Sequence, residues 1–98
     1  MAYGIRIDRI KSDFAAITGG GAPCNRPSYS AADAEARAYF MKAFDSLGLS
    51  VSVDGAGNIR AAMEGRKPSL PPVLTGSHID TVKDGGCFDG LTGSLCAL

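Results

Sequence analysis

Apolar side chains recur at helical spacing in the first part of the chain. The repeat has intervals of three, four and three residues and consists of Ile7, Ile10, Phe14 and Ile17. Such intervals place side chains on one face of an α-helix. The pattern therefore predicts an amphipathic packing helix over residues 4–17. It ends at the glycines of residues 19–21, because glycine is favoured at helix C-termini.

A second helical pattern follows a capping signal. Ser30 with Asp33 resembles a capping box in which aspartate replaces the usual glutamate. The apolar positions that follow share one helical face, and they are Ala36, Phe40, Ala43, Phe44 and Leu47. We expect a helix from there to about Leu47, closed by Gly48, with its aromatic side chains in the core.

The middle of the chain changes to a period of two. Leu49–Val53 alternates as a half-buried strand does, and a second alternating run contains Ile59, Ala61 and Met63. The glycine-containing segment Asp54–Asn58 separates the two runs and predicts a turn. Together these features predict a β-hairpin.

Two shorter apolar runs lie near the end of the chain. Val73–Ser77 follows a polar, proline-rich connection and is predicted to be a short, central, buried strand. Leu91–Leu98 begins an apolar helix and carries no stop signal. The order helix, helix, hairpin, strand, helix predicts an α/β fold with helices against a mixed sheet. In such folds ligands bind beyond the carboxyl ends of strands, which is where the residues after Ser77 lie.

The composition narrows the class of protein. Ninety-eight residues suffice for one small domain, and ten basic and ten acidic residues give zero net charge. That balance argues against nucleic acid or a membrane surface as partners. The chain has no apolar stretch near the ~20 residues that span a bilayer, and its start lacks a secretory signal. Three cysteines without a Cys-x-x-Cys pair disfavour a disulfide framework, so we expect a cytoplasmic protein.

The chemistry is concentrated after the last predicted strand, where His78, the single histidine, precedes Asp80 and Asp89. Residues two apart in extended backbone project to the same side, so Asp80 can accept the N–H of a metal-binding His78. Asp89 follows a Gly-Gly turn, and its two oxygens can bridge cations about 3.5–4 Å apart. The pattern predicts half of a metal site. The alternative is a His–Asp pair at the surface followed by an ordinary Asp-Gly turn, because both structures use the same residues.

The order of residues also resembles a known family. Gly76–Val82 reads Gly-Ser-His-Ile-Asp-Thr-Val and Gly85–Gly90 reads Gly-Gly-Cys-Phe-Asp-Gly, and Tyr29–Asp33 and Asp54–Ile59 add further matches. In this order the segments resemble the metal-dependent amidohydrolases. That family includes N-carbamoyl-L-amino-acid hydrolases, beta-ureidopropionases and allantoate amidohydrolases, and it is related to aminoacylases and metal-dependent peptidases.

The resemblance implies that residues 1–98 are the N-terminal portion of a three-layer, zinc-aminopeptidase-like α/β catalytic domain with a mixed sheet. It implies hydrolysis of a linear amide or N-carbamoyl bond in a small molecule by a metal-activated water. His78 and Asp89 would bind two divalent ions (Zn, Mn, Co or Ni), and Asp80 would support catalysis by orienting His78. The resemblance further implies a homodimer, with the general base and the remaining ligands beyond Leu98. A metallopeptidase or aminoacylase of the same clan, or a non-catalytic piece with an incomplete site, are the alternatives.

Two more residues leave alternatives open. Cys87 stands where the resembling family often has a basic or amide residue. Its thiol either points away, lies beside the metals, or acts as nucleophile with His78 as base in a metal-free amidase. Arg26 lies in a loop that the resemblance places near the active site, where it either binds an anion or is solvated.

Overall fold

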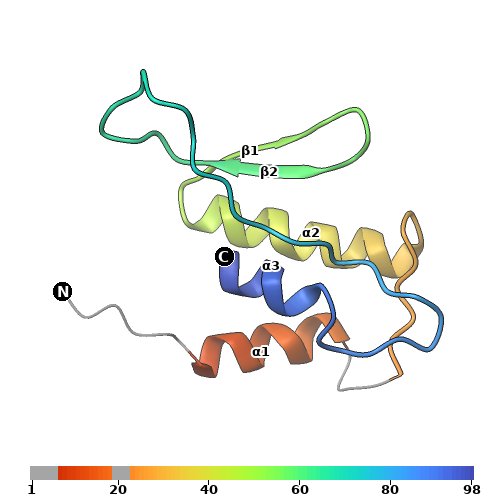
Figure 1. Ribbon diagram of the computed structural model, residues 1–98. Coiled ribbons are helices and arrows are strands. Elements are labelled where there is room, and N and C mark those ends of the chain that lie inside the picture. Colours follow the sequence, from red (N-terminus) through yellow and green to blue (C-terminus); the bar gives the residue numbers. More distant parts are fainter. Residues whose placement is uncertain (1–6, 19–22) are drawn as a thin grey trace.

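Three helices and one β-hairpin make up the described part of the chain, which is residues 7–18 and 23–98 of the computed structural model (Figure 1). In chain order the elements are α1 (Ile7–Thr18), α2 (Ala31–Ser46), β1 (Ser50–Val53), β2 (Ile59–Ala62) and α3 (Leu91–Ala97). Helix α1 packs against both α2 and α3, and the hairpin packs against α2. The two N-terminal helices, the hairpin and the last helix are thereby confirmed. Residues 4–6 and 19–21 of the first helix prediction lie outside the described residues.

The start of α2 is capped as the sequence indicates, with one shift. The Ser30 hydroxyl accepts a hydrogen bond from the Asp33 N–H at 3.2 Å. The Asp33 carboxylate reaches back to the N–H of Tyr29 at 3.0 Å, one residue beyond the usual position. The Ser30 N–H instead donates to the Pro27 carbonyl at 3.1 Å, so each of these backbone donors has an acceptor.

Helix α2 ends in a Schellman motif, which is made of two backbone hydrogen bonds. The Leu49 N–H donates to the Phe44 carbonyl at 3.2 Å and the Gly48 N–H donates to the Asp45 carbonyl at 2.9 Å. This pattern needs a left-handed residue after the helix, and Gly48 supplies it with a φ of 74°. Leu47, the last member of the predicted apolar face, therefore sits at the cap with 46% of its surface exposed.

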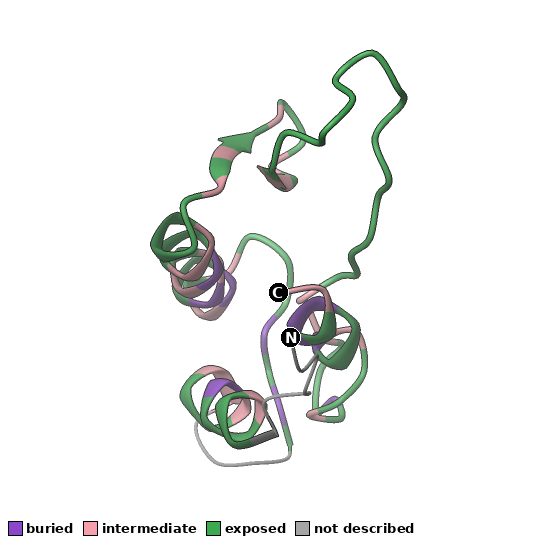
Figure 2. Cartoon of the chain, turned by 90° about the vertical axis from the view of Figure 1, so that its left-hand side faces the viewer, coloured by how far each residue is buried: buried purple, intermediate pink, exposed green. Residues whose placement is uncertain are grey.

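The core lies between the three helices, where Figure 2 shows the buried positions turned toward one another. Its centre is Phe40 of α2 with Leu91 and Leu95 of α3. Partly buried apolar residues surround it, namely Phe14, Ile17, Phe44, Ile79 and Leu98. Because Ile79 adjoins His78, the core fixes the backbone next to the predicted site.

The hairpin has the predicted antiparallel pairing, with Val51 opposite Ala61 and Val53 opposite Ile59. Its turn is held by the Asp54 carboxylate, which accepts from the N–H groups of Ala56 at 3.0 Å and Asn58 at 2.9 Å. The buried face is narrower than the alternation predicts, since Val53 is 46% exposed.

The connection between the hairpin and the site contradicts one prediction. The structure has no strand at residues 73–77, and Val73 and Leu74 are 98% and 86% exposed. An apolar run becomes a buried strand only where a neighbouring strand pairs with it. The described sheet contains only β1 and β2, so the predicted central strand and mixed sheet are not formed within these residues.

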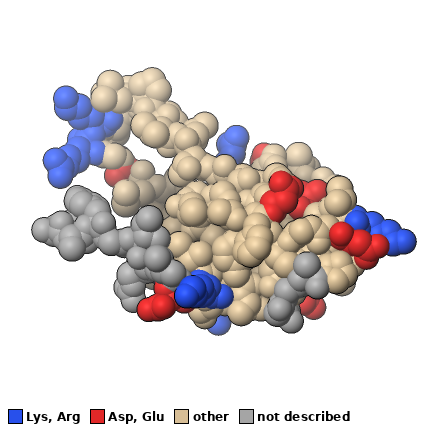
Figure 3. Space-filling model, turned by 60° about the horizontal axis from the view of Figure 1, so that its bottom comes forward, with Lys and Arg blue, Asp and Glu red and all other residues tan. Residues whose placement is uncertain are grey.

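Charged groups of both signs are scattered over the face in Figure 3, separated by wide uncharged areas. Among the described residues, no helix is long and apolar enough to cross a membrane.

Candidate functional site

Two loops pair to form the base of the site. The first is residues 76–90, here called the site loop, and the second is residues 23–30, here called the anchor loop. Cys24 and Gly85 exchange two backbone hydrogen bonds of 2.9 and 2.8 Å, an isolated antiparallel bridge. Beside it, the Asn25 side chain accepts from the Asp84 N–H at 2.8 Å and donates to the Asp84 carboxylate at 3.2 Å. The site loop is thus held along much of its length by the anchor loop.

Arg26, the one charged residue of the anchor loop, is buried, with 3% of its surface exposed. Its Nε–H donates to the Ile79 carbonyl at 2.6 Å, and its backbone carbonyl accepts from the Thr81 N–H at 2.8 Å. A second guanidinium nitrogen, Nη2, is buried without a hydrogen-bond partner among the described residues. The alternative of a solvated arginine is therefore wrong, and the guanidinium supports the backbone directly after His78.

His78 lies between the two predicted aspartates. Its Nδ1 is 3.2 Å from a carboxylate oxygen of Asp80 and 3.1 Å from the Asp80 carbonyl oxygen. Its Nε2 is 3.5 Å from Oδ2 of Asp89. Both Asp80 oxygens can only accept, so Nδ1 carries the proton in those bonds. In a neutral ring this leaves the Nε2 lone pair facing the Asp89 carboxylate.

All three side chains are open to solvent. His78 and Asp80 are about half-exposed, and Asp89 is 85% exposed. A hydrogen bond from the Ser28 hydroxyl of the anchor loop, with a smaller contribution from His78, holds the pKa of Asp80 below its usual value. Asp80 is therefore a carboxylate near neutral pH, which is the form that accepts the N–H of His78.

His78 packs closely against the N-cap and first turn of α3. A β-carbon on Gly90 would lie 2.4 Å from Cε1 of His78, so only glycine fits there. One turn later, Gly93 leaves room for the Ser77 side chain, which a β-carbon would approach to 2.7 Å. The Ser94 hydroxyl donates to the His78 carbonyl at 3.1 Å. Small residues of α3 thus allow the close approach that fixes the histidine.

Replacing Gly90 with alanine is expected to displace the imidazole and to destabilise the chain. The new methyl group would overlap the ring, and φ at this position is 67°, where an L-residue is strained. We expect a loss of about 1–3 kcal/mol in urea unfolding. The matched control is Gly86→Ala, because a β-carbon there meets nothing within 4 Å. Equal stabilities of the two variants would contradict the close packing of Gly90 on His78.

Cys87 does not pair with His78. Its sulfur is 3.3 Å from the sulfur of Cys24, whereas the described contacts of the His78 nitrogens are with Asp80 and Asp89. Burial, followed by the neighbouring Cys87, raises the pKa of the Cys24 thiol. The arrangement gives no support to the alternative of a Cys87 nucleophile with a His78 base. Sequence reasoning missed the approach of Cys24, which lies 63 positions away and has no local signal.

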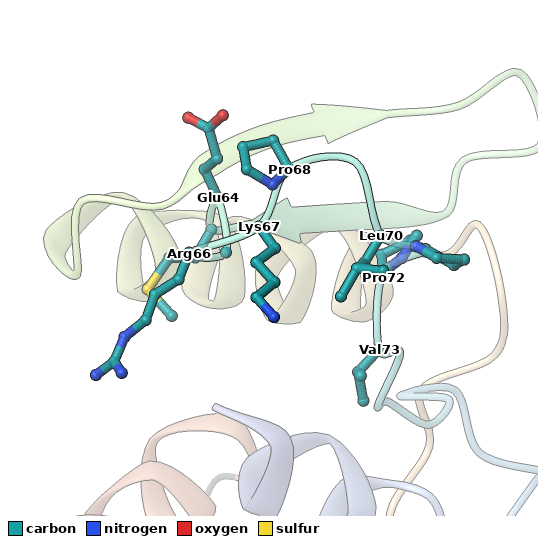
Figure 4. A pocket seen from close by; sticks show the side chains of 10 residues that line it. Glu64, Arg66, Lys67, Pro68, Leu70, Pro72 and Val73 are labelled. Carbon is teal, nitrogen blue, oxygen red and sulfur yellow. The ribbon is translucent and has the colours of Figure 1, made fainter.

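One hollow lies away from these residues. It has a volume of about 700 Å³ and lies under the connection between Met63 and Val73 (Figure 4). It contains none of the three predicted site residues, and its lining belongs to an exposed loop. Among the described residues, no group of three or more His, Cys, Asp or Glu side chains is placed to hold a metal ion. The described site thus offers two converging donors, the imidazole of His78 and the carboxylate of Asp89.

No protein-family profile matches the chain. Among curated proteins, an N-carbamoyl-L-amino-acid amidohydrolase of Paenarthrobacter aurescens is 38% identical over 93 residues, covering 95% of this chain and 23% of that protein. An allantoate amidohydrolase of Escherichia coli (strain K12) is 38% identical over 86 residues, covering 88% of this chain and 20% of that protein.

Solved structures similar in fold include a protein of the same kind as these sequence relatives. A hydantoinase/carbamoylase family amidase from Burkholderia ambifaria superposes with a TM-score of 0.83 at 35% identity, over 90% of this chain and 22% of that one. AtUAH in complex with glyoxylate gives a TM-score of 0.87 at 32% identity, over 94% and 23% of the two chains.

These relatives belong to one class, the amidohydrolases that cleave carbon–nitrogen bonds other than peptide bonds. Along nearly its whole length, the chain is homologous to the hydantoinase/carbamoylase family within that class. The predicted resemblance is therefore confirmed. The chain spans between 15% and 23% of the length of the curated relatives it matches.

Proposed function

We propose that the full-length protein is a metal-dependent amidohydrolase that cleaves a linear amide or N-carbamoyl bond of a small molecule. Homology to N-carbamoyl amino acid and allantoate amidohydrolases supports the bond type. A related structure holds glyoxylate, which supports a small substrate. The proposal includes the three-layer catalytic domain and the homodimer that the resemblance implies.

One observation carries the metal role: Nε2 of His78 faces Oδ2 of Asp89 at 3.5 Å. That distance is longer than the ~2.7–3.2 Å of a good hydrogen bond. Two unprotonated donors across such a gap repel each other, and a cation bound between them removes this repulsion. Two ligands of a tetrahedral zinc ion, each about 2.1 Å from the metal, are about 3.4 Å apart. The separation of the two donors is therefore compatible with both of them binding one divalent ion.

The remaining roles follow from the same geometry. Asp80 fixes the His78 tautomer by accepting its Nδ1 proton, which keeps Nε2 available as a ligand. Asp89 is highly exposed, so its second oxygen is accessible to a second ion. When bound, the divalent ions (Zn, Mn, Co or Ni) polarise the scissile carbonyl and make a water nucleophilic near neutral pH. A catalytic zinc usually has three protein ligands, so further ligands must come from outside the described residues.

Metal removal tests the proposal. Treating the full-length protein with a chelator and removing the complex is expected to abolish hydrolysis of N-carbamoyl amino acids or allantoate. Adding back Zn²⁺, Mn²⁺, Co²⁺ or Ni²⁺ should restore it, because the chemistry depends on the bound ions. The measurement is release of ammonia or the free amino acid before and after metal is restored.

Turnover that survives complete chelation would contradict the metal role and favour the thiol route through Cys87. A protein that binds metal yet hydrolyses none of these substrates would instead fit a non-catalytic site. The metal content of each sample, measured by atomic spectrometry, separates these outcomes.

A further inference from the structure

Two cysteines from distant parts of the sequence meet beneath the site. The sulfur atoms of Cys24 and Cys87 are 3.3 Å apart. Cys24 is 4% exposed and Cys87 is half-buried, so the pair is reached from solvent through Cys87. The third cysteine, Cys96, is exposed on α3, outside this pair.

The backbone is held in place at Cys24 and at Gly85, two residues before Cys87. Cys24 is joined to Gly85 by the two hydrogen bonds of the bridge, and its carbonyl also accepts from the Thr81 hydroxyl at 3.2 Å. Gly85 itself is tightly enclosed, since a β-carbon there would lie 3.0 Å from the Val82 carbonyl oxygen. The sulfurs are thus brought together by paired backbone and not by two flexible side-chain ends.

We propose that Cys24 and Cys87 form an oxidation site, which closes to a reversible disulfide on reaction with a hydroperoxide. A disulfide has an S–S distance of about 2.05 Å, so the sulfurs must approach by roughly 1.2 Å. Closing this gap requires rotation of the two side chains and a small shift of the half-buried Cys87 segment. The backbone bridge between Cys24 and Gly85 keeps the anchor loop and the site loop in register.

The reaction balances with hydrogen peroxide as oxidant. The more accessible Cys87 sulfur attacks one peroxide oxygen, the O–O bond breaks, and the departing oxygen leaves as water after taking up the thiol proton. Cys87 is then a sulfenic acid. The Cys24 sulfur attacks the Cys87 sulfur, the S–O bond breaks as the S–S bond forms, and the hydroxyl group leaves as water with the Cys24 proton. The two sulfurs together lose two electrons to the peroxide.

The disulfide would join the anchor loop covalently to the site loop two residues before Asp89. The proposed oxidation site does not depend on the proposed hydrolase function. Its product is a disulfide, which is detected by mass and needs neither bound metal nor substrate turnover.

Peptide mapping tests the proposal in a full-length Cys96→Ser variant, which keeps both members of the pair. The reduced protein is treated with hydrogen peroxide, its remaining thiols are alkylated, and it is digested with trypsin. Arg26 precedes proline and resists cleavage, so Cys24 is expected in the peptide of residues 12–37. Cys87 is expected in the peptide that begins at Asp84.

The expected result is one cross-linked species of these two peptides, lighter by two hydrogen atoms than their sum and separated again by dithiothreitol. The added substitution Cys87→Ser should remove it completely. Oxidation that leaves Cys24 and Cys87 separately alkylated would overturn the proposal. Accumulation of Cys87 sulfinic acid beside an alkylated Cys24 would overturn it equally, since the second thiol then fails to reach the first.

Discussion

Replacing His78 with alanine in the full-length protein is expected to abolish hydrolysis while leaving the fold nearly intact. Nε2 of the imidazole lies 3.5 Å from Oδ2 of Asp89, and the His78 side chain is half-exposed. Losing a supporting residue of a metal ligand costs about 10–100-fold in affinity or activity, so loss of a ligand should exceed about 100-fold. Exposed substitutions change stability by only about 0.5 kcal/mol. Steady-state turnover and urea unfolding of the metal-free protein measure the two effects.

Lys83→Ala is the matched control, because Lys83 is an exposed residue of the same loop. It should keep both turnover and stability. If His78→Ala retained turnover within a few-fold of the parent at saturating metal, His78 would not be a ligand. If it unfolded at much lower urea without metal, its role would be packing and not chemistry.

The elements that the sequence predicted correctly depend on neighbours in the chain. Both hairpin strands and α2 with its Ser30 cap arise from periodicity and from hydrogen bonds within a few residues. The apolar stripe of α1 packs on the core through Phe14 and Ile17 as expected. Such signals can be read from the sequence because the interacting residues are only a few positions apart.

The errors fall where burial depends on distant partners. The run at Val73 and Leu74 has the composition of a buried strand, but composition cannot supply the neighbouring strand that would cover it. Val53 lies on the apolar face that the alternation predicts, but its surface is 46% exposed.

The candidate site combines both kinds of information. The proximity of His78 to Asp80 follows from a spacing of two, and the return of Asp89 was predicted from the glycines that precede it. The contacts of the anchor loop could not be predicted from its residues. No local pattern indicates that Arg26 is buried and donates to the Ile79 carbonyl, or that Ser28 donates to Asp80. Those contacts join residues more than fifty positions apart and require the folded chain. The metal roles of His78 and Asp89 stay predictions.

Replacing Asp89 with asparagine is expected to reduce metal binding and turnover by more than about 100-fold, with little change in stability. The substitution keeps the size of the side chain but removes the negative charge that faces Nε2 of His78 at 3.5 Å. An amide cannot neutralise two cations held about 3.5–4 Å apart, so their mutual repulsion should expel at least one. Isothermal titration with Zn²⁺ or Mn²⁺, together with metal content after dialysis, measures the loss.

The control for Asp89→Asn is Asp84→Asn, which removes the same charge from the same loop. Asp84 binds Asn25 and has a φ of 53°, a conformation that asparagine tolerates well. A general electrostatic effect of the loop would weaken metal binding equally in both variants, whereas a ligand role predicts a large loss only for Asp89→Asn. Unchanged stoichiometry and affinity in Asp89→Asn would mean that the carboxylate facing His78 holds no ion, and the binuclear site would have to be sought elsewhere.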